Sequence, residues 1–143
     1  MKTIALLVLN YNGVSVTVGG TPLLDVTLPT LFDACDRIEG RADVVVIDNK
    51  SSDDSIAHIR SRYPRVKVYQ APTNDFLFSY NEVVKTVSSD IIMLLNNDMC
   101  LAADALGPIV DAFSDDGIFA VGADVFQSYH GRPSNDPDSR CLR

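Results

Sequence analysis

Short, continuous aliphatic runs alternate with amphipathic segments along this chain, and that alternation restricts its fold more than any other feature of the sequence. Residues 4–9 are uninterrupted aliphatic side chains, a pattern typical of a strand buried on both faces of a sheet. Apolar runs predict strands at residues 4–9, 43–47, 91–95 and 118–126, and alternating residues predict a shorter, half-exposed strand at 66–69. Strands that alternate with helices predict an α/β fold with an open, mostly parallel twisted sheet and helices on both faces.

Amphipathic segments between these runs predict the covering helices. Apolar side chains recur at helical spacing from residue 28 to residue 38, with Pro29 in the expected first turn and Gly40 after the last. Further helices are expected at residues 56–63, 80–87 and 106–113. Residues 14–26, which carry two adjacent glycines and a proline, are interpreted as a long loop.

Charge, apolar run lengths and cysteine placement limit the cellular compartment and the kinds of binding partner that are expected. Twelve Lys and Arg residues against 19 Asp and Glu residues give a formal charge of −7, which argues against a nucleic-acid partner. The longest apolar runs are too short to span a bilayer, and the N-terminus lacks the pattern of a signal peptide. Three scattered cysteines favour a reducing compartment. We therefore predict a cytoplasmic domain at residues 1–128 and a flexible tail at 129–143, with the oligomeric state left open.

Polar side chains follow three of the predicted strands at the point where each strand ends. Residues 10–12 (Asn-Tyr-Asn) follow the first strand, Asp48 and Asn49 end the second, and residues 96–98 (Asn-Asn-Asp) end the fourth. In open α/β sheets, ligands bind outside the carboxyl ends of the strands. The sequence therefore predicts a binding site at this edge of the sheet.

Asp98 is the candidate metal ligand at this edge. It follows an aliphatic run, so its carboxylate is expected at the mouth of the sheet. Mg²⁺ is typically held by one or two carboxylates together with substrate phosphates, so Asp98 would bridge through Mg²⁺ or Mn²⁺ to a diphosphate. Asn96 or Asn97 would add amide contacts. The alternative is that these three residues only turn the chain and cap the next element.

Asp48 is the candidate ligand for the nucleoside. A carboxylate at the end of the neighbouring strand can accept hydrogen bonds from a base N–H or a ribose hydroxyl. Its alternative role is to cap the following helix, but Ser51, Ser52 and Asp53 stand closer to the start of that helix and are better placed for capping. Binding is therefore the preferred interpretation.

Four segments in this order resemble family 2 glycosyltransferases of the GT-A fold. They are residues 9–13 (Leu-Asn-Tyr-Asn-Gly), 46–55 (Val-Ile-Asp-Asn-Lys-Ser-Ser-Asp-Asp-Ser), 74–81 and 94–98 (Leu-Leu-Asn-Asn-Asp). The subgroup that the chain most resembles is rhamnosyltransferase-like, in which the Asp-x-Asp element often reads Asn-Asn-Asp. The resemblance covers residues 4–126 and implies a Rossmann-like, nucleotide-sugar-binding half of a transferase.

The resemblance also implies roles for individual residues and a reaction. In the implied donor site, Asn10 and Tyr11 lie beside the base, and Asp48 contacts the base or ribose. Asn74 and Asn81 belong to a polar segment of the donor site. Asn97 lies near the ribose, and Asp98 binds the metal ion and the diphosphate. The implied reaction is inverting transfer from a nucleoside-diphosphate sugar to a hydroxyl of a saccharide or lipid-linked acceptor. Mg²⁺ or Mn²⁺ would stabilise the leaving diphosphate.

Three features depart from the family pattern. Only one carboxylate is present in residues 96–98, and the loop at 14–26 is longer than is usual, which we interpret as an insertion. The family's catalytic base lies well downstream of the metal motif, and none of Asp124, Asp136 and Asp138 is assigned to that role. The chain is therefore expected to bind a donor while lacking the downstream base.

Two other functions remain as alternatives. The first is a non-catalytic nucleotide- or sugar-binding module derived from a transferase, which the single carboxylate and the missing base favour. The second is a flavodoxin-like signalling domain with Asp48 as the phosphoryl acceptor. Such a domain needs an acidic pair at the end of its first strand, and here that strand ends in Asn-Tyr-Asn, so the second alternative is disfavoured.

Overall fold

A parallel sheet of four strands forms the centre of the computed structural model, which describes residues 2–125, 128–129 and 132–133. The strand order is β5-β4-β1-β6, and every neighbouring pair is parallel. The strands are β1 (Ile4–Asn10), β4 (Ala42–Asp48), β5 (Lys67–Gln70) and β6 (Ile91–Asn96). The register places Asn10 opposite Asp48, so the polar ends of β1 and β4 meet at one edge of the sheet.

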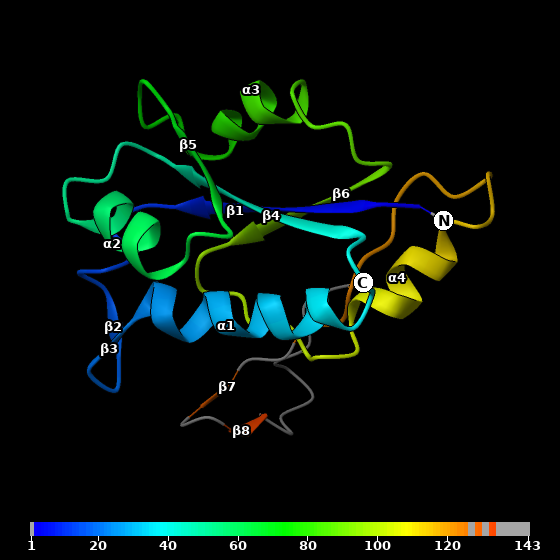
Figure 1. The fold of residues 1–143 in the computed structure, drawn as a ribbon, viewed down its shortest axis with the longest axis horizontal. Coiled ribbons are helices and arrows are strands. Elements are labelled where there is room, and N and C mark those ends of the chain that lie inside the picture. Colours follow the sequence, from blue (N-terminus) through cyan, green and yellow to red (C-terminus); the bar gives the residue numbers. More distant parts are fainter. Residues whose placement is uncertain (1, 126–127, 130–131, 134–143) are drawn as a thin grey trace.

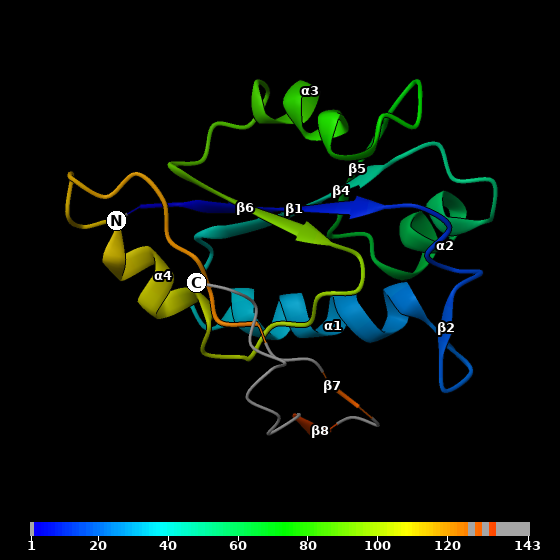
Figure 2. The same cartoon turned by 180° about the vertical axis from the view of Figure 1, so that it is seen from behind.

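Helices cover both faces of this sheet, which confirms the predicted α/β class (Figure 1). On one face lie α1 (Leu23–Asp36) and α4 (Leu106–Ala112), and α3 (Tyr80–Val84) lies on the other, preceded by the 3₁₀ helix η1 (Phe76–Ser79). The view from behind places α4 beside α1 (Figure 2). The helix α2 (Ser55–Arg62) contributes Ile59 to the core on the α1 side. Among the described residues, no helix has the length and apolar character needed to cross a membrane.

Alternate residues of β1 supply the two cores. Ile4, Leu6 and Val8 pack with the buried leucines of α1, and Ala5 and Leu7 pack on the opposite face with α3. All five of these side chains are at most 1% exposed. Full burial of an aliphatic side chain contributes about 1.5–3 kcal/mol, so β1 anchors both layers and fixes where its carboxyl end lies.

The start of α1 and the loop before it differ from the prediction. The helix begins at Leu23 rather than at residue 28, and Pro29 therefore lies inside it. Leu24 and Leu28 are fully buried, and their burial offsets the hydrogen bond that the proline cannot donate. Residues 14–26 are also not wholly a loop, because β2 (Thr17–Val18) and β3 (Thr21–Pro22) pair as an antiparallel hairpin. Its two glycines both have positive φ, which a tight turn requires.

The predicted fifth strand is wrong over the part that the structure describes. Residues 118–125 form neither a helix nor a strand, and Phe119 is 98% exposed. An aliphatic run becomes a strand only when a neighbour accepts and donates its backbone hydrogen bonds, and β6 is paired only with β1 in the described sheet. Phe126 lies outside the described residues.

The predicted tail at 129–143 is described at three positions only. Of these residues, 129, 132 and 133 lie in β7 (Ser128–Tyr129) and β8 (Arg132–Pro133), which pair with each other antiparallel. The flexibility of the tail and the domain boundary at residue 128 therefore stay predictions.

A half-buried carboxylate, Asp25, joins α1 to α2. Oδ1 of Asp25, on α1, accepts a hydrogen bond from the Tyr63 hydroxyl at 2.5 Å and lies 2.7 Å from Nε2 of His58. The Arg62 Nε atom is 3.4 Å from the same oxygen. Burial opposes the ionisation of Asp25, but the hydrogen bonds from Tyr63 and His58 and the nearby charges outweigh it and lower the pKa of this carboxyl. Burial and the contact with Asp25 raise the pKa of Tyr63 to about 12.

Substitution of Asp25 by Asn is expected to reduce the free energy of unfolding by about 2 kcal/mol near neutral pH, because hydrogen bonds to a charged acceptor are lost. The folded-state pKa of Asp25 is depressed, so its contribution is fully present above the ordinary carboxyl pKa of 3.8 and disappears as the pH falls through the lower folded value. Urea unfolding at several pH values should show the two proteins converging at the acid end. A constant difference across the pH range would contradict this account.

Candidate functional site

Asn10 and Asp48 form the centre of the strand-end edge. They are 0% and 1% exposed, and Asn10 Nδ2 donates to Asp48 Oδ1 at 2.9 Å. The Ser51 hydroxyl donates to the same oxygen at 2.6 Å, and the Ser51 backbone N–H donates to Asp48 Oδ2 at 3.0 Å. Both carboxylate oxygens therefore accept hydrogen bonds from the protein itself.

Asn97 extends this network to the third strand. Its Nδ2 donates to Asn10 Oδ1 at 2.9 Å, and its backbone N–H donates to the Leu9 carbonyl at 3.1 Å. The Thr27 hydroxyl of α1 donates to the Asn97 carbonyl at 2.7 Å. The side chain of Asn10 thus bridges Asp48 and Asn97, and one chain of hydrogen bonds connects the ends of β4, β1 and β6.

Asp53 holds the loop that follows β1. Its Oδ2 accepts from the backbone N–H groups of Val14 at 3.0 Å and Ser15 at 2.8 Å, while Oδ1 accepts from the N–H of Ser55 at 3.0 Å. Burial opposes ionisation here, but the Ser55 side chain and these backbone hydrogen bonds outweigh it and lower the pKa of Asp53. The carboxylate therefore bonds the first N–H of α2 and also joins two loops.

Asn12 closes the same loop from the other side. It has a φ of 52°, its N–H donates to the Ser51 hydroxyl at 2.9 Å, and its Oδ1 accepts from the backbone N–H of Ser52 at 2.8 Å. Ser51 and Ser52 were predicted to cap α2. Instead they bind the loop after β1, and Asp54, which occupies the N-cap position of α2, makes no side-chain capping hydrogen bond.

Gly13 lies where the loop passes closest to this network. A Cβ atom at this position would be 2.3 Å from Asn10 Oδ1 and 3.0 Å from Asn97 Nδ2. Any other residue would therefore push apart the two amides that connect β1 to β6.

Substitution of Gly13 by Ala is expected to destabilise the protein by about 1–3 kcal/mol, the usual range when a well-packed interior receives an extra methyl group. Gly107 of α4 provides the matched control, because no atom lies within 4 Å of the Cβ that alanine would add there. In a helix, Gly to Ala stabilises by up to about 1 kcal/mol. Thermal or urea unfolding should therefore shift in opposite directions for the two variants, and equal shifts would contradict the close approach.

Asn74 contacts the side chain of Asn49, the residue that follows Asp48, and not the network itself. The side chain of Asn49, which is 2% exposed, lies 2.6 Å from Asn74 Oδ1 and 2.6 Å from the Ser79 hydroxyl. These contacts hold the segment that leads into η1, where Phe76 has a φ of 51° and is 75% exposed. Asn81 is exposed on α3 and joins none of these hydrogen bonds within the part of the chain that the structure describes.

Three predicted site residues flank the network and are open to solvent. Tyr11 is 50% exposed after β1, and Asn96 and Asp98 are exposed on either side of Asn97. Within the described residues, no three His, Cys, Asp or Glu side chains lie close enough together to hold a metal ion. Asp98 is the one carboxylate of residues 96–98, and a single carboxylate fits a Mg²⁺ ion that takes its remaining ligands from phosphates and water.

The sequence matches the model of one protein family over most of its length. Residues 23–140 match Glycosyl transferase family 2. A search among curated proteins finds no match.

Solved structures share the fold of this chain at low sequence identity. S. aureus TarS 1–349 in complex with UDP-GlcNAc is 20% identical, with a TM-score of 0.64 over 80% of this chain and 31% of that one. A cytidylyltransferase from Leptospira borgpetersenii is 21% identical, with a TM-score of 0.61 over 82% of this chain and 51% of that one. A 4-diphosphocytidyl-2C-methyl-D-erythritol synthase is 17% identical, with a TM-score of 0.61 over 94% of this chain and 67% of that one. The chain thus spans about a third of the TarS fragment that it matches.

Proposed function

The chain belongs to glycosyl transferase family 2, and from that membership we propose that its strand-end edge binds a nucleoside-diphosphate sugar for inverting transfer to an acceptor hydroxyl. The observation that carries the proposal is the hydrogen-bonded chain from Asp48 through Asn10 to Asn97. It fixes three strand ends together and leaves Tyr11 and Asp98 exposed directly beside them. A rigid, polar edge at the carboxyl ends of parallel strands is where α/β sheets bind nucleotides.

The nucleoside half of the donor would lie near the end of β1. Tyr11 offers a half-exposed ring against which a base can pack. Asp48 is 1% exposed, so its contact with a base or ribose requires a local shift of the chain at Ser51, whose hydroxyl now bonds the carboxylate. Asn74 and Asn81 would border the same part of the donor.

The diphosphate half would lie at the end of β6. Mg²⁺ or Mn²⁺ held by Asp98 would offset the negative charge that develops on the leaving diphosphate. The exposed Asn96 amide and the neighbouring Asn97 would hydrogen-bond the ribose or phosphates. We assign no catalytic base, since Asp124 is an exposed residue of an irregular segment.

Similar structures suggest which donors to test first. The TarS structure contains UDP-GlcNAc, and two of the other similar structures are those of a cytidylyltransferase and a diphosphocytidyl-methylerythritol synthase. Pyrimidine nucleoside diphosphates and their sugars are therefore the first candidates, with a saccharide or lipid-linked hydroxyl as the acceptor.

Titration calorimetry with UDP, CDP, dTDP and GDP tests the proposal. We expect at least one pyrimidine diphosphate to bind with a dissociation constant of about 1 mM or below, and to bind more tightly when Mg²⁺ or Mn²⁺ is present. GDP serves as the purine comparison. If none of the four binds, with or without a metal ion, the donor site is wrong.

The second candidate function is a non-catalytic nucleotide- or sugar-binding module. The observation that favours it is the single carboxylate of residues 96–98, together with the absence of any group of three potential metal ligands among the described residues. Slow release of UDP from a UDP-sugar that binds would favour the transferase, because transferases generally leak donor to water. Tight binding with no release would favour the module.

A further inference from the structure

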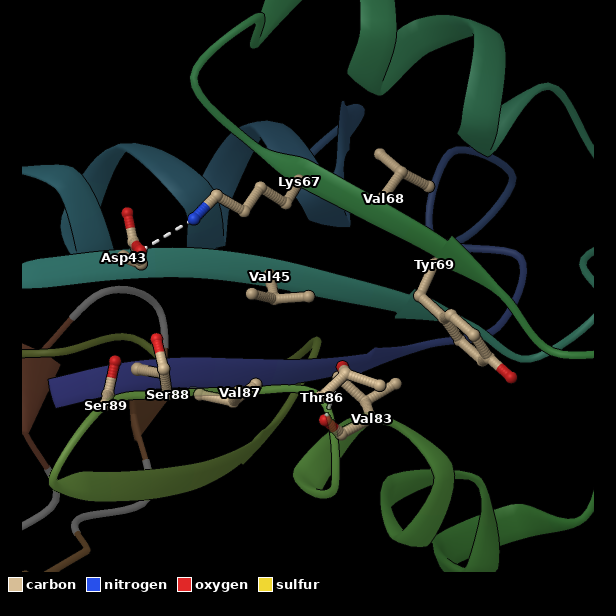
Figure 3. A pocket seen from close by; sticks show the side chains of 11 residues that line it. Asp43, Val45, Lys67, Val68, Tyr69, Val83, Thr86, Val87, Ser88 and Ser89 are labelled. Atoms are coloured by element: carbon tan, nitrogen blue, oxygen red, sulfur yellow. Dashed lines mark hydrogen bonds and ion pairs between the residues drawn. The ribbon is translucent and has the colours of Figure 1, made fainter.

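A cavity of about 240 Å³ lies on the α3 side of the sheet, between the sheet and the connection that leaves α3 (Figure 3). Asp43, near the start of β4, lies on its lining, five residues before Asp48 in the same strand. The lining extends along β5 to Tyr69, which pairs with Ile47, but it includes none of the network residues Asn10, Asp48 and Asn97. The cavity is therefore a separate place on the molecule.

The shortness of α3 explains why the cavity exists. This helix has five residues and covers the part of the sheet around Ile47. The chain then continues through Thr86–Ser89 without regular structure, and these residues line the cavity together with Val45, which is 8% exposed. Val45, Val83 and Val87 form an apolar floor there.

The rim of the cavity is polar and electrically balanced. Lys67 Nζ lies 2.7 Å from Asp43 Oδ2, so the two opposite charges compensate each other. Figure 3 shows this pair on one side of Val45, with Ser88 and Ser89 on the other. Hydrogen-bonding groups of both kinds thus surround the apolar floor: a carboxylate that accepts, an ammonium that donates, and hydroxyls that do both.

We propose that this cavity binds one ring of an uncharged carbohydrate. The C–H face of a sugar ring is apolar and matches the valine floor, while its hydroxyls can donate to Asp43 and accept from Lys67. Clefts for drug-sized ligands occupy about 300–1,000 Å³, so a smaller cavity suits a single ring. An anion would have to displace Asp43 from Lys67, and the intact ion pair therefore favours a neutral ligand. The inference does not depend on the donor site at the other edge.

Backbone NMR titration of the full 143-residue chain with neutral methyl glycosides tests this site. We expect saturable shifts of the Val45, Lys67 and Ser89 amides, with a dissociation constant in the millimolar range, about −4 kcal/mol of binding free energy. The amides of Tyr11 and Asp98 should not move. No saturable shift with any glycoside, or shifts only at the strand-end edge, would overturn the proposal.

Two lysine variants test whether glycoside binding depends on the cavity or on surface charge in general. Lys67→Met should weaken glycoside binding by roughly fivefold or more, since it removes a charged donor from the ligand. Lys85→Met is the matched control, because Lys85 forms a comparable exposed ion pair with Glu82, 3.4 Å away, and does not line the cavity. Equal effects of the two substitutions, or no effect of the first, would contradict the assignment.

Two competing probes test the class of ligand. Inorganic phosphate and benzoate should bind the cavity more weakly than the glycosides, and tighter binding of either would overturn the carbohydrate assignment. UDP with Mg²⁺, added to the same sample, reports separately on the strand-end edge. If UDP causes shifts at the strand-end edge and no glycoside causes shifts at the cavity, only the cavity proposal is rejected. If a glycoside causes shifts at the cavity and UDP causes none, only the donor site is rejected.

Discussion

Replacement of Asp98 by alanine is expected to lower the affinity for a nucleoside diphosphate in the presence of Mg²⁺ by about tenfold or more, which corresponds to roughly 1.4 kcal/mol. Asp98 is exposed, and it is the one carboxylate of the strand end that it follows. A metal ion that depends on one protein carboxylate and on the donor phosphates loses its only charged protein ligand in this variant. Binding measured without the metal should change little, and calorimetry under both conditions would show the difference.

Two further variants make the Asp98 result specific. Asp104 is an exposed acid in the connection that follows β6, so Asp104→Ala removes the same charge without removing the proposed ligand. It should leave the effect of Mg²⁺ intact. Asp98→Asn, which retains an oxygen but not the charge, should behave like Asp98→Ala. If a variant at Asp98 binds UDP in the presence of Mg²⁺ as tightly as the parent chain does, Asp98 is not a metal ligand.

The central strands could be predicted from the sequence because burial on both faces leaves a continuous aliphatic run. At their carboxyl ends β1, β4 and β6 each extend one residue beyond the predicted run, to the polar residue that ends it, and β4 also begins one residue earlier, at Ala42. The run at 118–126 is also largely apolar, although Gly122 and Asp124 interrupt it, and over its described part it forms no strand. The composition of a segment indicates whether it can be buried. A segment forms a strand only if another strand lies beside it, and whether one does depends on the whole fold.

The sequence predicted that the polar strand ends meet at one edge, but not the hydrogen bonds between them. Parallel topology alone brings Asn10, Asp48 and Asn97 to one edge, and the register confirms that the first two lie side by side. The hydrogen bonds of Asp48 to Ser51 carry a local signal, a serine three residues after an aspartate, which is typical of a turn. The link from Asp53 to Val14 carries none, because it joins loops that are 39 residues apart.

Replacement of Asp48 by alanine is expected to reduce the free energy of unfolding by about 3 kcal/mol or more. The substitution would leave the Asn10 amide and both Ser51 donors short of their acceptor in a buried place, and each unsatisfied buried group costs about 1–3 kcal/mol. Asp43, at the start of the same strand, is 57% exposed in an ion pair with Lys67. Its replacement by alanine should cost less than about 1 kcal/mol, as for other surface pairs.

Conservative variants distinguish the loss of hydrogen bonds from the loss of volume at Asp48. Asp48→Asn keeps the volume but turns an N–H₂ group toward donors, so it should recover only part of the stability. Ser51→Ala removes one donor to Asp48 and should cost about 1 kcal/mol. Asn10→Ala combined with Asp48→Ala should cost less than the sum of the single changes, because the two residues share a bond. Additive costs in urea unfolding would mean that the network does not fix the strand ends, and the proposed donor edge would lose its physical basis.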